Sequence, residues 1–343
     1  GMVRPVAVKF DSQDQLYAID NITGEIWQIN HQTGSKELYT TTSAGMDNLA
    51  FDSSDRLFIA NSIKGIVGEV SKNGDVRALN RGGMSQPGGV AVLPRKNRLV
   101  ASAFVADVYS LREYNSITGR ELSVHGDSSG IYYPFTVSPQ GKNLILTSWF
   151  ANTVQIWDPR NKQVVQNHFN FVTPTNAINF QGDLIVTELG AAAGAARILR
   201  VSDGETTTLA DVSNSIYLPT GLAANDDNLW VSDAATGMVW RIAEAGQLIP
   251  VASGLASPEG LALDKEGHLL VVEAGADRLS RINLETGAIS TVKEGLKTGD
   301  SGIPRTPPTY TMNGVAVSKF GRIFITGDRG NVIHSSRFKF RSF

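Results

Sequence analysis

Oxygen-bearing side chains recur at one position of a repeated phrase in this sequence, just before a short apolar strand. Asp47, Glu259 and Asn313 stand there, in three of eight copies of a repeated phrase. Carboxylate and amide oxygens are the ligands that hard cations such as Ca²⁺ and Mg²⁺ prefer. If the fold brings these loops to a common axis, the three residues predict a divalent-metal site. The alternative is that these polar side chains cap their own loops and hydrate the mouth of a channel.

A second set of acidic or amide side chains ends the second strand of most copies. Glu188 and Glu273 are its longest members, and a glutamate that reaches into a site can act as a general base. The shorter Asp20, Asn61 and Asp233 fit a structural role, because such side chains bond nearby backbone N–H groups. Glu188 and Glu273 are therefore the candidate catalytic residues.

Aromatic residues gather in the loops that are expected on the same side of the fold. Exposed aromatic groups beside acidic groups are typical of binding surfaces. The alternative is that these rings plug a channel or pack the long loops onto the strands. The candidate ligand-binding residues are Tyr133, Phe135, Trp149, Phe150, Tyr217 and Tyr310.

Several kinds of chemistry are excluded by what the sequence lacks. It has no cysteine, which excludes disulfides, thiolate nucleophiles, zinc–cysteine sites and iron–sulfur clusters. It has no histidine–carboxylate pair at metal or triad spacing, no G-x-S-x-G elbow, no phosphate loop and no dinucleotide fingerprint. No complete catalytic constellation is present.

Composition limits the partners. The 343 residues carry 31 Lys and Arg against 33 Asp and Glu, a net charge of −2, which argues against nucleic acid or an anionic membrane surface. No apolar run approaches ~18 residues, so no membrane span is expected. No signal peptide is visible. The compartment stays open, with a bacterial extracytoplasmic protein whose signal has been removed as the working expectation; the oligomeric state is not indicated.

The elements that must position these residues come from an internal repeat. Each copy has a short apolar strand, a polar turn, a second apolar strand and then an acidic or small polar residue. The second strand starts at Leu16, Leu57, Leu99, Leu144, Leu184, Leu229, Leu269 and Ile323. A third strand, a tight turn with Gly or Asn, and a fourth, more polar strand follow in most copies.

Four antiparallel strands in about 42 residues, repeated radially, indicate an all-β fold, a β-propeller. We predict eight four-stranded blades in one domain over residues 1–343, with seven as the fallback. Blades start near residues 6, 49, 90, 136, 177, 222, 261 and 315. The last copy stops after its third strand near residues 331–336, and residues 337–343 could supply the fourth.

The phrase P-x-G-[LV]-A-[VL]-D-x-x-G-x-L-[WYF]-V-[ST]-[DE], best seen at residues 258–273 and 219–233, resembles NHL-repeat propellers. It is equally similar to the gluconolactonase (senescence-marker) family, and more distantly to strictosidine synthase and virginiamycin B lyase. Gluconolactonase-like proteins hold a divalent ion with Glu, Asn and Asp from comparable loops, so the resemblance implies Ca²⁺ or Mg²⁺ at Asp47, Glu259 and Asn313. That family's Glu-Gly-Pro-x-Trp opening is missing, because the first copy reads Val3-Arg4-Pro5-Val6.

Two functions of different classes follow. The first is an NHL-type binding propeller that takes a small molecule or a peptide at the aromatic, partly acidic mouth of its channel. The second is a metal-dependent lactonase, hydrolase or lyase of the gluconolactonase or virginiamycin-lyase type, in which the ion polarises a carbonyl and Glu188 or Glu273 moves the proton.

Overall fold

The fold is built from antiparallel sheets that follow one another along the chain. The computed structural model describes residues 1–80, 82–94, 101–190, 192, 194–243, 246–299 and 312–336. Seven sheets of four strands and one of three are present, each with its strands in chain order. The all-β propeller-type fold and the count of eight sheets are confirmed. The last sheet has three described strands, as predicted, and its proposed fourth strand at residues 337–343 lies outside the described residues.

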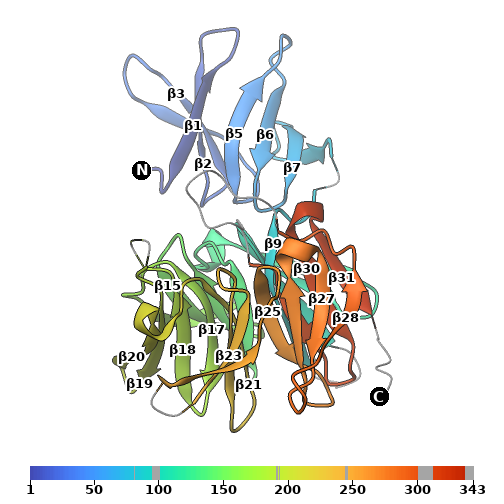
Figure 1. Ribbon diagram of the computed structural model, residues 1–343. Coiled ribbons are helices and arrows are strands. Elements are labelled where there is room, and N and C mark those ends of the chain that lie inside the picture. The colour runs from blue at the N-terminus through green and yellow to red at the C-terminus, as the bar shows by residue number, and fades with distance from the viewer. Residues whose placement is uncertain are drawn as a thin grey trace. The chain divides into compact units, whose positions relative to one another are not determined.

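Contacts divide the chain into two compact units, which we describe separately. Unit 1 comprises Gly1–Ser85 and Val124–Ile131, and unit 2 comprises Gln86–Ser123 and Tyr132–Phe343. In Figure 1, unit 1 is mostly blue and unit 2 runs from cyan to red. The expectation of one domain over residues 1–343 stays a prediction.

Unit 1 contains two sheets. Their strands are β1 (Pro5–Phe10), β2 (Leu16–Asp20), β3 (Glu25–Ile29), β4 (Lys36–Thr41), β5 (Met46–Phe51), β6 (Leu57–Asn61), β7 (Ile66–Val70) and β8 (Val76–Ala78). β1 contacts β5, so the first strands of the two sheets lie side by side.

Unit 2 contains six sheets. The first three are made of β9 (Pro87–Pro94), β10 (Ala101–Asp107), β11 (Ser110–Asn115), β12 (Glu121–His125), β13 (Thr136–Gln140), β14 (Asn143–Ser148), β15 (Thr153–Asp158), β16 (Gln163–His168), β17 (Pro174–Phe180), β18 (Asp183–Glu188), β19 (Arg197–Ser202) and β20 (Glu205–Asp211). The last three are made of β21 (Pro219–Ala224), β22 (Leu229–Asp233), β23 (Met238–Ile242), β24 (Leu248–Ala252), β25 (Pro258–Leu263), β26 (Leu269–Glu273), β27 (Arg278–Ile282), β28 (Ile289–Glu294), β29 (Val315–Val317), β30 (Ile323–Gly327) and β31 (Val332–Ser336).

The described helices are single 3₁₀ turns: η1 (Asp127–Ser129), η2 (Val212–Asn214), η4 (Ala274–Ala276) and η5 (Asp328–Gly330). Within the described ranges, the helices are all too short and too polar to cross a bilayer.

The sheets pack face to face through alternating apolar residues. We call the face of a sheet that packs on the preceding sheet its leading face, and the opposite one its trailing face. On β21–β24 the leading face, with Leu222 and Val231, joins one apolar cluster with the sheet before it. Its trailing face, with Trp230 and Val239, joins another with the sheet after it. Each sheet thus shields its neighbours, which explains why every copy needs apolar residues on both sides.

The six sheets of unit 2 close into a ring. Their first strands contact one another in the order β9, β13, β17, β21, β25 and β29, and β29 returns to β9. Hydrogen bonds follow the same circle: Gly89 N–H donates to Phe135 O (2.8 Å) and Gly260 N–H to Asn313 O (3.0 Å). The Thr220 hydroxyl likewise donates to Pro258 O (2.8 Å).

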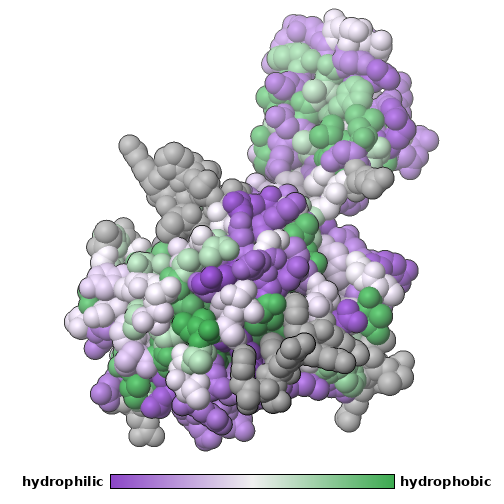
Figure 2. Space-filling view, turned by 45° about the vertical axis from the view of Figure 1, so that its right-hand side comes forward, coloured by the Kyte–Doolittle hydropathy of each residue, from purple (hydrophilic) through white to green (hydrophobic). Residues whose placement is uncertain are grey.

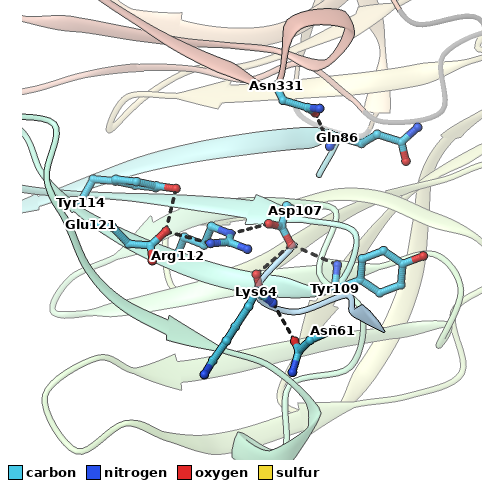
Figure 3. Close-up of polar contacts among 10 residues, drawn as sticks. Asn61, Lys64, Gln86, Asp107, Tyr109, Arg112, Tyr114, Glu121 and Asn331 are labelled. Atoms are coloured by element: carbon cyan, nitrogen blue, oxygen red, sulfur yellow. Dashed lines mark hydrogen bonds and ion pairs between the residues drawn. The ribbon is translucent and has the colours of Figure 1, made fainter. Parts of the chain in front are cut away.

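The contact that closes the ring joins residues more than two hundred positions apart. Gly314 N–H donates to Gly88 O (3.2 Å), and the buried Thr326 hydroxyl donates to the same carbonyl. Gln86 N–H donates to the side chain of Asn331 (2.6 Å), as Figure 3 shows. The same view shows the buried Arg112 Nε donating to Asp107 (2.7 Å), which ties β11 to the end of β10.

Glycine permits the close approach of the first strands. An added Cβ would lie 2.0 Å from Glu259 O at Gly221 and 2.6 Å from Asn313 O at Gly260. Both partners are backbone atoms that cannot rotate away, so any larger side chain would push neighbouring sheets apart.

Candidate functional site

A channel runs through the centre of unit 2. It encloses a cavity of about 370 Å³ that is lined by all six first strands. The lining is mainly Val, Leu, Ala and Gly, with hydroxyl and amide groups at Thr136, Ser138, Asn176, Asn179, Thr220 and Asn313. None of its described lining residues is ionisable. The channel is therefore a mostly apolar site with a few neutral hydrogen-bonding groups.

Two of the three predicted metal ligands meet beside this channel. Glu259 and Asn313 are fully buried, and one Glu259 oxygen accepts from both the Asn313 backbone N–H (2.7 Å) and its side-chain amide (2.8 Å). The Asn313 oxygen accepts from Asp328 N–H (3.0 Å). Asp47, in contrast, is an exposed residue of β5 in unit 1.

This arrangement does not fit a divalent ion. Asn313 turns its NH₂ group toward the Glu259 carboxylate, and its oxygen already accepts a backbone hydrogen bond. In the part of the chain that the structure describes, no group of three or more His, Cys, Asp or Glu residues is placed to hold a metal. A metal site at Asp47, Glu259 and Asn313 stays a prediction.

Glu188, at the end of β18, is fully buried and fully engaged by its neighbours. It accepts a hydrogen bond from Val172 N–H (2.9 Å). Its other oxygen binds Arg197 through Nε (2.8 Å) and Nη2. Arg197 is its direct cross-strand partner on β19, so the strand register positions the ion pair.

Glu273 repeats this arrangement two sheets later. Its carboxylate accepts from Arg278 Nε (2.7 Å) and Nη2 (2.8 Å), from Ala256 N–H (2.9 Å) and from the Ser280 hydroxyl. Burial opposes its ionisation, but the hydrogen bonds from Arg278, Ala256 and Ser280 outweigh burial and lower the pKa of Glu273. A carboxylate held in this way is a weak base.

The shared task of these residues is to anchor a loop. Asp233 accepts from Tyr217 N–H (2.7 Å), as Glu188 accepts from Val172 N–H and Glu273 from Ala256 N–H. In each case the side chain that ends the second strand binds the loop entering its own sheet. The structural role predicted for Asp233 thus extends to both glutamates, and their catalytic role stays a prediction. Sequence reasoning missed the arginines, although each stands opposite its glutamate once the second and third strands are paired.

The predicted aromatic residues separate into a packed group and exposed rings. Phe135 and Trp149 are buried, with ring centroids 4.9 Å apart, in a cluster with Val108. Phe150 packs on Phe135 at 5.2 Å but is 55% exposed.

Of the other three, the two that the structure describes, Tyr133 and Tyr217, do not join that group. Tyr133 is half-buried and lies 6.5 Å from Tyr109. Tyr217 is 52% exposed, in the loop before β21. Tyr310 lies outside the described residues.

Comparison with known proteins supports the fold. Neither a family model nor a curated protein matches the chain. Among solved structures, a putative gluconolactonase is 14% identical over 75% of this chain and 89% of its own, with a TM-score of 0.55. Regucalcin from Agrobacterium tumefaciens, described as a calcium-binding protein, is 16% identical over 72% and 83%, with a TM-score of 0.50. A streptogramin B lyase is 14% identical over 98% and 93%, with a TM-score of 0.35. The first two of these structures confirm the resemblance to NHL and gluconolactonase-like propellers at the level of the fold.

Proposed function

We propose that unit 2 is a binding module that takes an uncharged small molecule, or an uncharged side chain of a peptide, into its central channel. The observation that carries this proposal is the cavity of about 370 Å³ whose described lining has no ionisable group. Its size lies in the lower part of the range for ligand pockets. A charged ligand would lose its hydration there without gaining a counter-charge, so a neutral ligand is favoured.

Two asparagines of β17 supply the polar contacts. Asn176 accepts from Ala177 N–H (2.8 Å) and donates to Thr220 O (3.3 Å), so most of its capacity serves the ring. No hydrogen bond of the Asn179 side chain is found among the described residues, and this residue lines the channel. Asn179 can therefore donate to and accept from a bound carbonyl or hydroxyl group.

The exposed aromatic side chains form a surface on the loops that connect the strands of unit 2. Phe150 lies in the turn after β14 and Tyr217 in the loop that enters β21. In a propeller, such loops lie at the end of the channel where the first strands begin. Phe135 and Trp149 pack against Phe150, so in this proposal they form the buried base of the aromatic mouth and Phe150 and Tyr217 are its exposed rings.

The test uses a neutral probe and its charged counterpart. We would compare gluconamide with gluconate, a neutral and an anionic molecule of similar shape that both survive heating, by thermal unfolding of the wild type, the Asn179→Leu variant and the control Gln166→Leu. Gln166 is exposed on the outer strand β16. The proposal expects the amide to raise Tm in the wild type and the control but not in Asn179→Leu, with no effect of gluconate. An equal response to gluconate, or a shift that survives in Asn179→Leu, would contradict it.

A lactonase is the second candidate, because the buried Glu259 carboxylate lies against Asn313, a residue that lines the channel, although this pair as arranged does not fit a divalent ion. Two structural neighbours, a putative gluconolactonase and a calcium-binding regucalcin, have names that are consistent with such an activity. Proton release from glucono-1,5-lactone, followed with Ca²⁺, with Mg²⁺ and with EDTA, tests it. Hydrolysis that needs the ion and is lost in Glu259→Gln would replace the binding proposal; a rate equal to the protein-free rate would remove the lactonase.

A further inference from the structure

Unit 1 carries two sheet faces whose equivalents in unit 2 are buried. Register places Val8 of β1 where Leu222 stands in β21, because both lie opposite the same position of the second strand. Leu222 is 4% exposed against its preceding sheet, whereas Val8 is 56% exposed. Phe10 is also exposed, although its counterpart Phe51 packs on Tyr17 with ring centroids 4.8 Å apart. Within unit 1, the leading face of the first sheet is thus an apolar packing surface that no preceding sheet covers.

Within unit 1, no following sheet covers the trailing face of the second sheet. Val67 and Leu79 are 46% and 49% exposed. Val67 corresponds by register to Val239, which is fully buried in the cluster between β21–β24 and the next sheet. Hydrophobic side chains gather on the face of unit 1 that is turned to the viewer in Figure 2.

A polar group on this trailing face indicates what covers it. The Asn48 oxygen accepts from Leu49 N–H (2.9 Å), as the Asn176 oxygen accepts from Ala177 N–H (2.8 Å). In unit 2 this leaves the Asn176 NH₂ group to donate to a first-strand carbonyl of the following sheet. The Asn48 NH₂ group is exposed and has no such acceptor among the described residues. By analogy with Asn176, the Asn48 NH₂ group is placed to donate to a first-strand carbonyl of another sheet.

We propose that these two faces bind each other between copies of the chain, with the leading face of β1–β4 from one copy packed on the trailing face of β5–β8 from the next. The chemistry that must cover each face is that of a propeller sheet. In unit 2 the ring closes through β29 and β9, so its described sheets already have neighbours on both sides.

The internal contact of unit 1 gives the expected details. Within one copy, Phe51 packs on Tyr17 and Leu49 joins the cluster of Ile19. Between copies, Phe10 therefore packs on Phe58, and the Asn48 NH₂ group binds the Val6 carbonyl.

Each copy offers one face of each kind, so the contact runs head to tail and must close into a ring to remain finite. The ring of unit 2 contains six sheets. Because unit 1 contains two sheets, three copies of it would also form a ring of six. We therefore expect an assembly of three chains.

Light scattering of the purified full chain measures its mass. The expected result is a concentration-dependent three-chain species in the wild type, with a dissociation constant raised at least about tenfold in Val8→Glu, since an unpaired charge would be buried in an apolar contact. The matched control is Val165→Glu, because Val165 is 48% exposed on a sheet of unit 2. A single-chain mass at every concentration overturns the proposal, as does equal weakening by both variants.

Cross-linking tests the register of the contact. Because the chain has no cysteine, a Phe10→Cys chain and a Phe58→Cys chain each carry a single thiol. Mixed and oxidised, they should form the disulfide between the two variants and not within either one. A disulfide of Phe10→Cys with itself would show a two-fold contact and overturn the head-to-tail arrangement, as would no cross-link in a sample that remains oligomeric.

Discussion

Replacing Glu273 by glutamine separates an anchoring role from a catalytic one. The substitution keeps the shape of the side chain but removes the charge that binds Arg278 through two nitrogens. Hydrogen bonds to charged groups contribute about 1.5–3 kcal/mol. Glu273 is fully buried, but the Arg278 side chain is 33% exposed, so solvent screens part of this. We therefore expect Glu273→Gln to lower the free energy of unfolding by about 2 kcal/mol.

The matched control, Glu266, lies in the turn between β25 and β26. Glu266 binds Arg281 at 2.6 Å, but its side chain is 55% exposed, and exposed pairs contribute only about 0.2–1 kcal/mol. Urea unfolding followed by tryptophan fluorescence measures both variants. If Glu273→Gln and Glu266→Gln differ by less than about 0.5 kcal/mol, the anchoring argument is wrong. If Glu273→Gln keeps the wild-type stability and loses a hydrolytic activity, Glu273 is a catalytic base instead.

Three further outcomes follow from the contacts described. Thr326→Val removes a buried hydroxyl that accepts from Gly314 N–H (2.7 Å) and donates across the ring closure; we expect a loss of about 1–3 kcal/mol in urea unfolding, against almost none for the exposed control Thr206→Val. Phe135→Ala should cost about 3–5 kcal/mol because the ring is buried, whereas Phe150→Ala should leave Tm nearly unchanged, and equal losses would contradict the division of the aromatic group. The pKa of Glu273 is lowered in the fold from its ordinary value of 4.5, so its ionised form stabilises the fold fully above pH 4.5 and this stabilisation is lost as the pH falls through the lowered pKa. The free energies of unfolding of the wild type and Glu273→Gln should therefore converge only in acid. A difference that grows on acidification would contradict the lowered pKa.

The number of sheets could be predicted from the sequence because it depends on local pattern. Each copy carries its own alternation and turn residues, so eight copies predict eight sheets. Which sheets share a ring depends on contacts such as that of Gly314 with Gly88, and a repeat that looks the same in every copy has no local signal for them.

The site could be predicted only in part, for a related reason. The residue type at the end of each second strand was visible, but the atoms that bind Glu188 and Glu273 come from the third strand and from the entering loop. Pairing the strands from their turns would have placed Arg197 and Arg278 opposite the two glutamates. The partial burial of the aromatic group could not be read in this way, because Phe135 and Trp149 are covered by loops from neighbouring sheets.

One register position accounts for how neighbouring sheets of unit 2 are joined. It is glycine in β9, β21 and β25 and immediately before β29, and an added Cβ there would lie within 2.6 Å of backbone in the next sheet. In β13 and β17 it carries a side chain that itself donates to the next sheet, from Thr136 to Thr175 O (3.0 Å) and from Asn176 to Thr220 O (3.3 Å).

In unit 2 this position therefore holds either glycine or a side chain that itself donates a hydrogen bond to the next sheet. In unit 1 it holds Ala7, which offers neither, and Asn48, which offers the second. Beside Ala7 the connection to the next sheet is made by Asn21, just after β2, whose side-chain amide donates to Met46 O (2.7 Å). The donor of Asn48 remains for a sheet that follows, so Asn48→Ala should weaken self-association if the head-to-tail contact forms, while Asn176→Ala should lower the stability of unit 2 and leave the mass of the assembly unchanged.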